Sequence, residues 1–148
     1  MVEFAIAASL LFTLLFAICE FSLLMKDYMV LTYAAREGAR MAALGASTTA
    51  IQNKILSSAT SLNTYNMVNP SSNLVMQCTD AMDTASYVTL TNTTISSTTY
   101  NAAPSGAHVR IQLTYPHTWV LGAWIASMLG TSSSSTINVG ATMIENRE

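Results

Sequence analysis

An uncharged apolar run near the N-terminus constrains the fold of this chain more than any other feature. No charged residue occurs from Phe4 to Cys19, and after Glu20 the run continues to Met25. As a helix, the 22 residues from Phe4 to Met25 extend about 33 Å, enough to cross a hydrocarbon core of about 30 Å. We therefore expect residues 1–26 to form a transmembrane or filament-core helix.

A cleaved signal peptide is the main alternative for this run. Such a peptide has a basic first region, a shorter apolar stretch and a small-residue cleavage site. No lysine or arginine precedes position 26, and the run leads directly into further helical sequence. The pattern favours a segment that is retained.

Composition narrows the class of protein further. The chain has 148 residues, enough for one domain, and 9% of them are charged against 51% hydrophobic. Soluble domains carry roughly 25% charged residues, so a chain this poor in charge is not a typical cytosolic protein. Disorder requires low hydrophobicity, so this chain is not disordered as a whole. Only six residues are basic, too few for a phosphate-binding patch, so we expect no nucleic-acid partner.

The apolar helix is expected to become amphipathic over residues 27–62. Beyond Asp27 the charged residues Arg36, Glu37 and Arg40 lie away from the apolar stripe, and we assign them to packing between helix and head, with Glu37 and Arg40 as a favourable pair. The stripe has the spacing of one helical face and comprises Phe21, Leu24, Met25, Tyr28, Leu31, Thr32, Ala35, Ala39 and Ala42.

A break in the helix is expected at Gly45, because glycine and the polar residues after it commonly end a helix. Ser47 or Thr48 can cap a second helical segment that ends near Leu62. We interpret the first 62 residues as one long rod with a possible kink.

The remaining residues, 63–148, are expected to form a β-rich globular head. Alternating and β-branched residues predict strands at 74–78, 87–91 (extending to 95), 108–115 and 136–144. Pro116 is expected to end the third strand. A long helix followed by a small antiparallel sheet is an α+β fold.

Two further stretches suggest surfaces that contact other molecules. The apolar sequence from Thr118 to Gly130 is too short to span a bilayer and is either core or an exposed subunit interface. Serine and threonine cluster at 91–99 and 131–136. These uncharged residues suit repeated contact between copies or O-linked glycans, and Asn92 begins a glycosylation sequon.

No pattern of residues indicates catalysis, so we expect no enzyme activity, no metal and no cofactor. His108 is expected on the polar face of a strand and His117 in a loop, outside any spaced metal motif. Asp80 and Asp83 suit a solvated turn better than a calcium site. The cysteines at 19 and 78 are expected to be buried thiols without a disulfide.

Two acids interrupt the apolar segment, and an acid in such a place suggests a function. Glu3 lies in the first turn, where it complements the helix dipole or pairs with a specific cation. Glu20 lies ~26 Å further along the axis. It either reaches toward lipid headgroups or has a specific partner.

The N-terminal sequence resembles the TadE-like family of tight-adherence, type IV pilin-like proteins. The resemblance rests on Val-Glu-Phe-Ala at 2–5, Glu20-Phe21 after the apolar run, and Ala-Ala-Arg-Glu-Gly-Ala-Arg at 34–40. It is strong over the first 45 residues and weak over the last 40. In the family, this acid lies a few residues after the prepilin-peptidase cleavage site, two positions further in than Glu3 lies here. We therefore expect the chain to be the mature form, either whole or without its first residues.

This resemblance implies a structural pilin that polymerises into an extracellular filament of the cell surface, a fimbrium that serves adhesion. The subunit would wait in the inner membrane, be processed by prepilin peptidase and be extracted by pilus assembly machinery. Glu3, Phe4, Glu20 and Phe21 would be the assembly residues, with Glu3 paired to a neighbour's α-amino group. The alternatives are a minor pilin-like protein that primes or tips a filament, or a membrane-anchored envelope protein that never polymerises.

Overall fold

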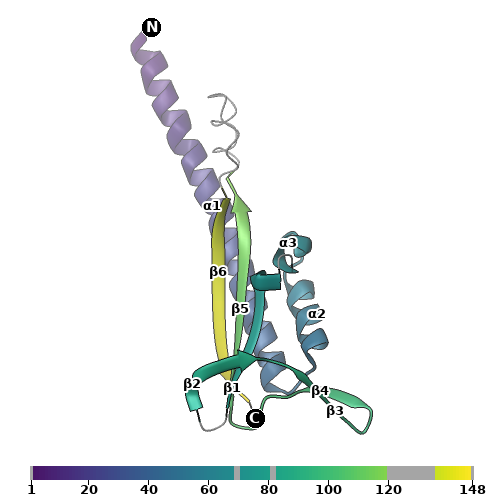
Figure 1. The fold of residues 1–148 in the computed structure, drawn as a ribbon. Coiled ribbons are helices and arrows are strands. Elements are labelled where there is room, and N and C mark those ends of the chain that lie inside the picture. Colours follow the sequence, from purple (N-terminus) through teal and green to yellow (C-terminus); the bar gives the residue numbers. More distant parts are fainter. Residues whose placement is uncertain (1, 69–70, 81–82, 120–135, 148) are drawn as a thin grey trace. The chain divides into compact units, whose positions relative to one another are not determined.

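The computed structural model describes residues 2–68, 71–80, 83–119 and 136–147. It confirms the expected α+β class: a long N-terminal helix is followed by short helices and by antiparallel strands (Figure 1). The chain divides into two compact units. One comprises Met1–Asp27 and Pro116–Asn138, and the other comprises Tyr28–Tyr115 and Val139–Glu148.

Helix α1 runs from Val2 to Ala43 and ends in a glycine turn. Gly45 has φ of +82°, a left-handed conformation that glycine adopts without the steric cost of a Cβ. The Ala46 amide donates to the Met41 carbonyl (3.1 Å) and the Gly45 amide to the Ala42 carbonyl (3.0 Å). These two bonds form a Schellman motif, so the expected helix break at Gly45 is confirmed.

Helix α2 (Thr48–Ser58) begins immediately after this turn. Ser47 is its N-cap, and the Ser47 hydroxyl accepts a hydrogen bond from the Ala50 amide, as expected for one of the two candidate caps. The Thr48 amide donates to the Asn92 side-chain oxygen at 2.8 Å.

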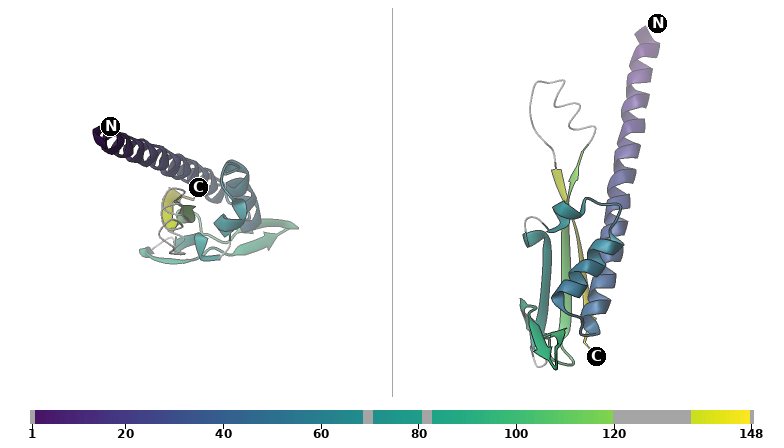
Figure 2. Two further views of the ribbon diagram at one scale, coloured as in Figure 1. Left: turned by 90° about the horizontal axis from the view of Figure 1, so that it is seen from above. Right: turned by 90° about the vertical axis from the view of Figure 1, so that its right-hand side faces the viewer.

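The expectation of one long rod is wrong, because α2 folds back along α1 (Figure 2). Lys54 of α2 forms an ion pair with Glu37 of α1 (3.6 Å). A Cβ at Gly38 would lie 2.6 Å from the Ile55 side chain, so any larger residue there would force the Ile55 side chain to shift. The Gly45 turn therefore reverses the chain into a helical hairpin.

The four-stranded sheet has the order β2-β1-β5-β6. The β1–β2 and β1–β5 pairs are antiparallel. Its strands lie at or near the expected positions: β1 (Leu74–Asp80), β2 (Asp83–Thr89), β5 (His108–Thr118) and β6 (Thr136–Asn146). The short helices α3 (Thr64–Val68) and η1 (Ser71–Asn73) precede β1.

Pro116 does not end β5, contrary to expectation. Strand β1 begins at Leu74, which pairs with Leu113. Pro116 therefore lies beyond the end of β1, and its missing amide removes no hydrogen bond to that strand.

A second small sheet was not expected. Strands β3 (Asn92–Ile95) and β4 (Thr98–Asn101) form an antiparallel hairpin. The turn residues Ser96 and Ser97 have φ of 49° and 68°. Positive φ at both central residues matches the right-handed twist of a two-residue hairpin, but serine is an uncommon choice there.

The core of the unit that begins at Tyr28 lies between α1, α2 and the sheet. Strand β5 contributes the alternating residues predicted for its buried face, and α1 contributes small residues that allow close packing. The fully buried side chains include Leu31, Ala35, Ala39, Ile51, Ile55, Val109 and Ile111.

Candidate assembly surface

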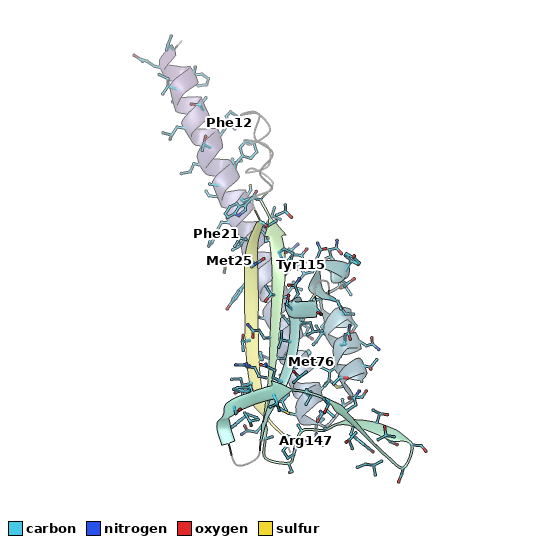
Figure 3. All side chains as sticks on the ribbon, viewed as in Figure 1. Phe12, Phe21, Met25, Met76, Tyr115 and Arg147 are labelled. Carbon is cyan, nitrogen blue, oxygen red and sulfur yellow. The ribbon has the colours of Figure 1, made fainter. Side chains whose placement is uncertain are left out.

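The first half of α1 is apolar and exposed. The helix is long and apolar enough to cross a membrane, and none of its most apolar stretch is buried. Phe12, Phe21 and Met25 project from the helix in Figure 3. The large exposed side chains there include Val2, Phe4, Ile6, Leu10, Leu11, Phe12, Leu14, Leu15, Phe16 and Ile18.

The few hydroxyl groups on this segment bond to the helix's own backbone. Ser9 donates to the Ile6 carbonyl (2.8 Å), Thr13 to the Ser9 carbonyl (2.8 Å) and Ser22 to the Ile18 carbonyl (2.9 Å). These bonds satisfy the hydroxyls without water. The segment therefore suits an apolar environment.

Three of the four expected assembly residues are exposed. Phe4 is 80% exposed and Phe21 is 62% exposed, and the neighbouring Glu3 is also exposed in the first turn of α1. Glu3 forms no ion pair with any described residue. These side chains are available to other molecules, and their role in assembly stays a prediction.

Glu20, the fourth, is instead buried, with 4% exposure. It engages another group of the chain rather than projecting from it. This burial favours the specific-partner alternative, because a carboxylate that reaches toward lipid headgroups must be accessible.

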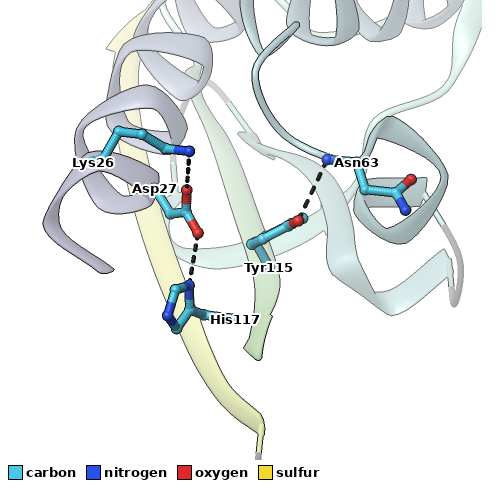
Figure 4. Close-up of polar contacts among 5 residues, drawn as sticks. All are labelled: Lys26, Asp27, Asn63, Tyr115 and His117. Atoms are coloured by element: carbon cyan, nitrogen blue, oxygen red, sulfur yellow. Dashed lines mark hydrogen bonds and ion pairs between the residues drawn. The ribbon is translucent and has the colours of Figure 1, made fainter. Parts of the chain in front are cut away.

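A buried acid–histidine contact lies at the end of this segment. The Asp27 carboxylate and the His117 ring nitrogen Nδ1 are 2.7 Å apart, and Lys26 lies 3.1 Å from the other carboxylate oxygen (Figure 4). The Asp27 and His117 side chains are 10% and 7% exposed. His117 Nε2 is buried without a hydrogen-bond partner among the described residues.

The prediction that His117 lies in a loop is wrong, because this residue belongs to β5 and is buried. The signal was present in the alternation of this strand. Val109, Ile111 and Leu113 share the buried face, and continuing the alternation past Pro116 places His117 on that face. The spacing of Glu20 and Asp27, seven residues apart, similarly marks one helical face.

The buried stripe of α1 differs at its start from the predicted one. Phe21, Met25 and Tyr28 are exposed, and the residues that are buried there are Glu20 and Asp27. From Leu31 onward the predicted stripe is confirmed, with Leu31, Ala35, Ala39 and Ala42 all at 0% exposure.

The three charged residues expected to pack helix against head behave differently from one another. Glu37 contacts α2 through Lys54 rather than pairing with Arg40. Arg36 and Arg40 are exposed and line an open groove of about 420 Å³, together with Leu44 and Glu145.

The described residues contain no group of three or more histidine, cysteine, aspartate or glutamate side chains that could hold a metal. Cys78 is buried as expected, but Cys19 is exposed, because the helix surface around it is uncovered. No disulfide joins the two. The side chains of Asp80 and Asp83, and the apolar stretch from residue 120 to 130, lie outside the described residues.

A long apolar helix that continues into a head with a small antiparallel sheet is a pilin-like arrangement. Residues 1–40 match the model of the family described as TadE-like protein, which confirms the resemblance seen in the sequence. That family is pilus-related and structural. No curated protein and no solved structure matches the chain.

Proposed function

We propose that this protein is a structural subunit that polymerises into an extracellular, Tad-type filament through the apolar half of α1. The observation that carries the proposal is the exposure of this half. Its side chains are uncovered from Val2 to Cys19, apart from a half-buried Ala8. The hydroxyl groups in this segment bond to the helix's own backbone, and its only charged side chain is Glu3 in the first turn. Contiguous apolar surface of this size marks an interaction site.

Two environments satisfy such a helix, and the proposed life cycle uses both. Before assembly the helix spans the inner membrane, where lipid covers it. After processing by prepilin peptidase and extraction by the assembly machinery, equivalent helices of other copies replace the lipid. The family match over residues 1–40 supports this reading, because it covers the whole apolar segment.

Glu3 gives the assembled state its specificity in this proposal. A carboxylate buried among apolar helices must be paired with a cation, since an unpaired charge costs several kcal/mol there. In the filament the cation comes from a neighbouring subunit, and its α-amino group is the partner that the resemblance suggests. Lipid insertion does not need this pair, because Glu3 lies at the end of the apolar run, where it reaches the interface.

Substitutions of Glu3 test the proposal. Glu3→Ala should leave the protein in the membrane but reduce sheared filament strongly, and Glu3→Gln should be intermediate because it keeps a hydrogen bond without the charge. Ser9→Ala, on the same exposed helix half, is the matched control. Both fractions are quantified by immunoblot. Normal filament yield from Glu3→Ala would contradict the role of Glu3, and the absence of any filament from the unsubstituted protein would contradict polymerisation.

Glu20→Gln separates two roles for the buried acid. If Glu20 serves the fold of its own subunit, its substitution should lower the amount of folded protein and the amount of filament in proportion. A loss of filament with normal folded protein would move the key assembly contact to Glu20.

A further inference from the structure

Two cations on α1 have no partner among the described residues. Arg36 and Arg40 form no ion pair or hydrogen bond with any described residue, whereas the other basic side chains all have contacts. Those contacts are Lys26 with Asp27, Lys54 with Glu37, Arg110 with Gln77 and the Tyr87 ring, and Arg147 with Asn101.

The two arginines also lie close together on one surface of the protein. Arg36 and Arg40 are one turn apart on the exposed face of α1, where like charges repel. They line the same groove, beside the 62%-exposed Leu44. Glu145 also lines the groove but forms no ion pair with either arginine. Glu37 lines the groove as well, but its carboxylate already pairs with Lys54. The two arginines, without partners among the described residues and beside the exposed Leu44, therefore suit an anionic group carried on an apolar helix.

We propose that this groove receives the N-terminal turns of α1 from a second copy of the chain, with the Glu3 carboxylate between Arg36 and Arg40. This inference rests on the proposed filament, and it gives Glu3 the two arginines as its partners there in place of the α-amino group that the resemblance suggests. Unlike an α-amino group, the two arginines are available as partners wherever the mature chain begins.

The residues that follow Glu3 are complementary to the groove. Ala5, Ala7 and Ala8 are small and permit close approach of two helices. Leu10, 70% exposed, lies two turns beyond Glu3 on nearly the same face of α1. Leu44 lies eight residues beyond Arg36, just after the last residue of α1. With Glu3 between the two arginines, Leu10 of the docked helix reaches the level of Leu44 along the helix axis.

The direction of docking follows from membrane insertion. Copies of one single-span protein insert with the same orientation, so their α1 helices leave the membrane parallel. Placing Glu3 between Arg36 and Arg40 then offsets the two copies by 33 to 37 residues, or about 50–55 Å along the helix axis. The offset leaves the first turns of one copy's apolar segment beside the groove of the next copy.

A charge exchange tests the pairing in the full-length protein. Arg36→Glu combined with Arg40→Glu should reduce sheared filament about tenfold or more, because Glu3 then faces like charges. Adding Glu3→Lys to that variant should restore filament. Thr60→Glu, which adds a carboxylate at an exposed position just after α2, should have no effect.

Cross-linking tests the offset directly. In a Cys19→Ser background, Leu10→Cys with Leu44→Cys should give covalent multimers on oxidation of assembled filaments, and Leu10→Cys with Tyr65→Cys should not. Filament that is unaffected by the arginine exchange, or that Glu3→Lys does not restore, would overturn the inference and leave the filament itself standing. Loss of membrane retention in the arginine variant without loss of assembly would assign the arginines to anionic lipid and would also overturn it.

Discussion

The buried contact between Asp27 and His117 should be strongly coupled, and a double-mutant cycle can measure this. In the first variant, His117→Leu leaves the Asp27 carboxylate buried with Lys26 as its remaining partner, and the Lys26 side chain is 50% exposed. In the second, Asp27→Val leaves a buried imidazole with neither nitrogen bonded to a described residue. The third variant carries both substitutions.

The expected free energies follow from burial. Removing one partner of a buried pair costs about 3–5 kcal/mol, and a half-exposed Lys26 offsets up to about 1 kcal/mol. We therefore expect His117→Leu to cost about 3 kcal/mol of unfolding free energy. Asp27→Val should cost about 2 kcal/mol, the cost of an unsatisfied buried polar group. The double variant should lose only about 1 kcal/mol, because two apolar side chains replace the pair.

Fluorescence provides a local measurement of this unfolding. The Trp119 ring lies 6.2 Å from the His117 ring, with an interplanar angle of 79°. A Trp124→Phe background leaves Trp119 as the only tryptophan of the two in the chain. Urea unfolding of full-length protein in detergent then gives the four free energies. Additive effects, with the double variant losing about 5 kcal/mol, would refute the coupling.

Two further predictions concern the packing around the end of α1. Gly38→Ala should destabilise the protein by about 1–2 kcal/mol despite its gain in helix propensity, because the new Cβ would lie 2.6 Å from buried Ile55. The control is Gly140→Ala, whose Cβ makes only an ordinary contact at 3.7 Å. Equal unfolding free energies for the two variants would contradict the close approach. Asn101→Leu should lower the unfolding free energy by about 2–3 kcal/mol in the same urea assay, because the Asn101 amide donates to the Ala42 and Ala46 carbonyls at 2.7 and 3.1 Å and is 3% exposed. Asn101→Asp should be about as costly, since it removes the same donor. A loss below about 0.5 kcal/mol for either variant would contradict this capping role.

Regular patterns in the sequence predicted much of the fold. The apolar run and the 3.6-residue stripe predicted α1, and alternation of apolar and polar residues predicted β5 and β6. Ser47 was a predictable cap, because its position after a glycine turn has a local chemical signature. Each of these features depends on residues close together in the chain.

The features that sequence reasoning missed depend on residues far apart. The reversal at Gly45 brings Ile55 of α2 close to Gly38 of α1. A glycine in the sequence does not by itself distinguish such a reversal from a kink. Asp27 and His117 are 90 residues apart in sequence, and neither belongs to a motif. Arg36 and Arg40 belong to the motif that resembles the family, but only the structure shows that they have no partner in the described part of the chain while Glu37 has one.

Analysis of filaments sheared from cells tests the central claim most directly. Electron microscopy would show whether filaments exist, and mass spectrometry would identify their main protein. We predict that this chain is the main protein and that a helical reconstruction shows the apolar half of α1 bundled inside. Filaments built from another protein, with this chain absent or confined to their tips, would contradict the claim, as would a surface without filaments and this chain held entirely in the membrane.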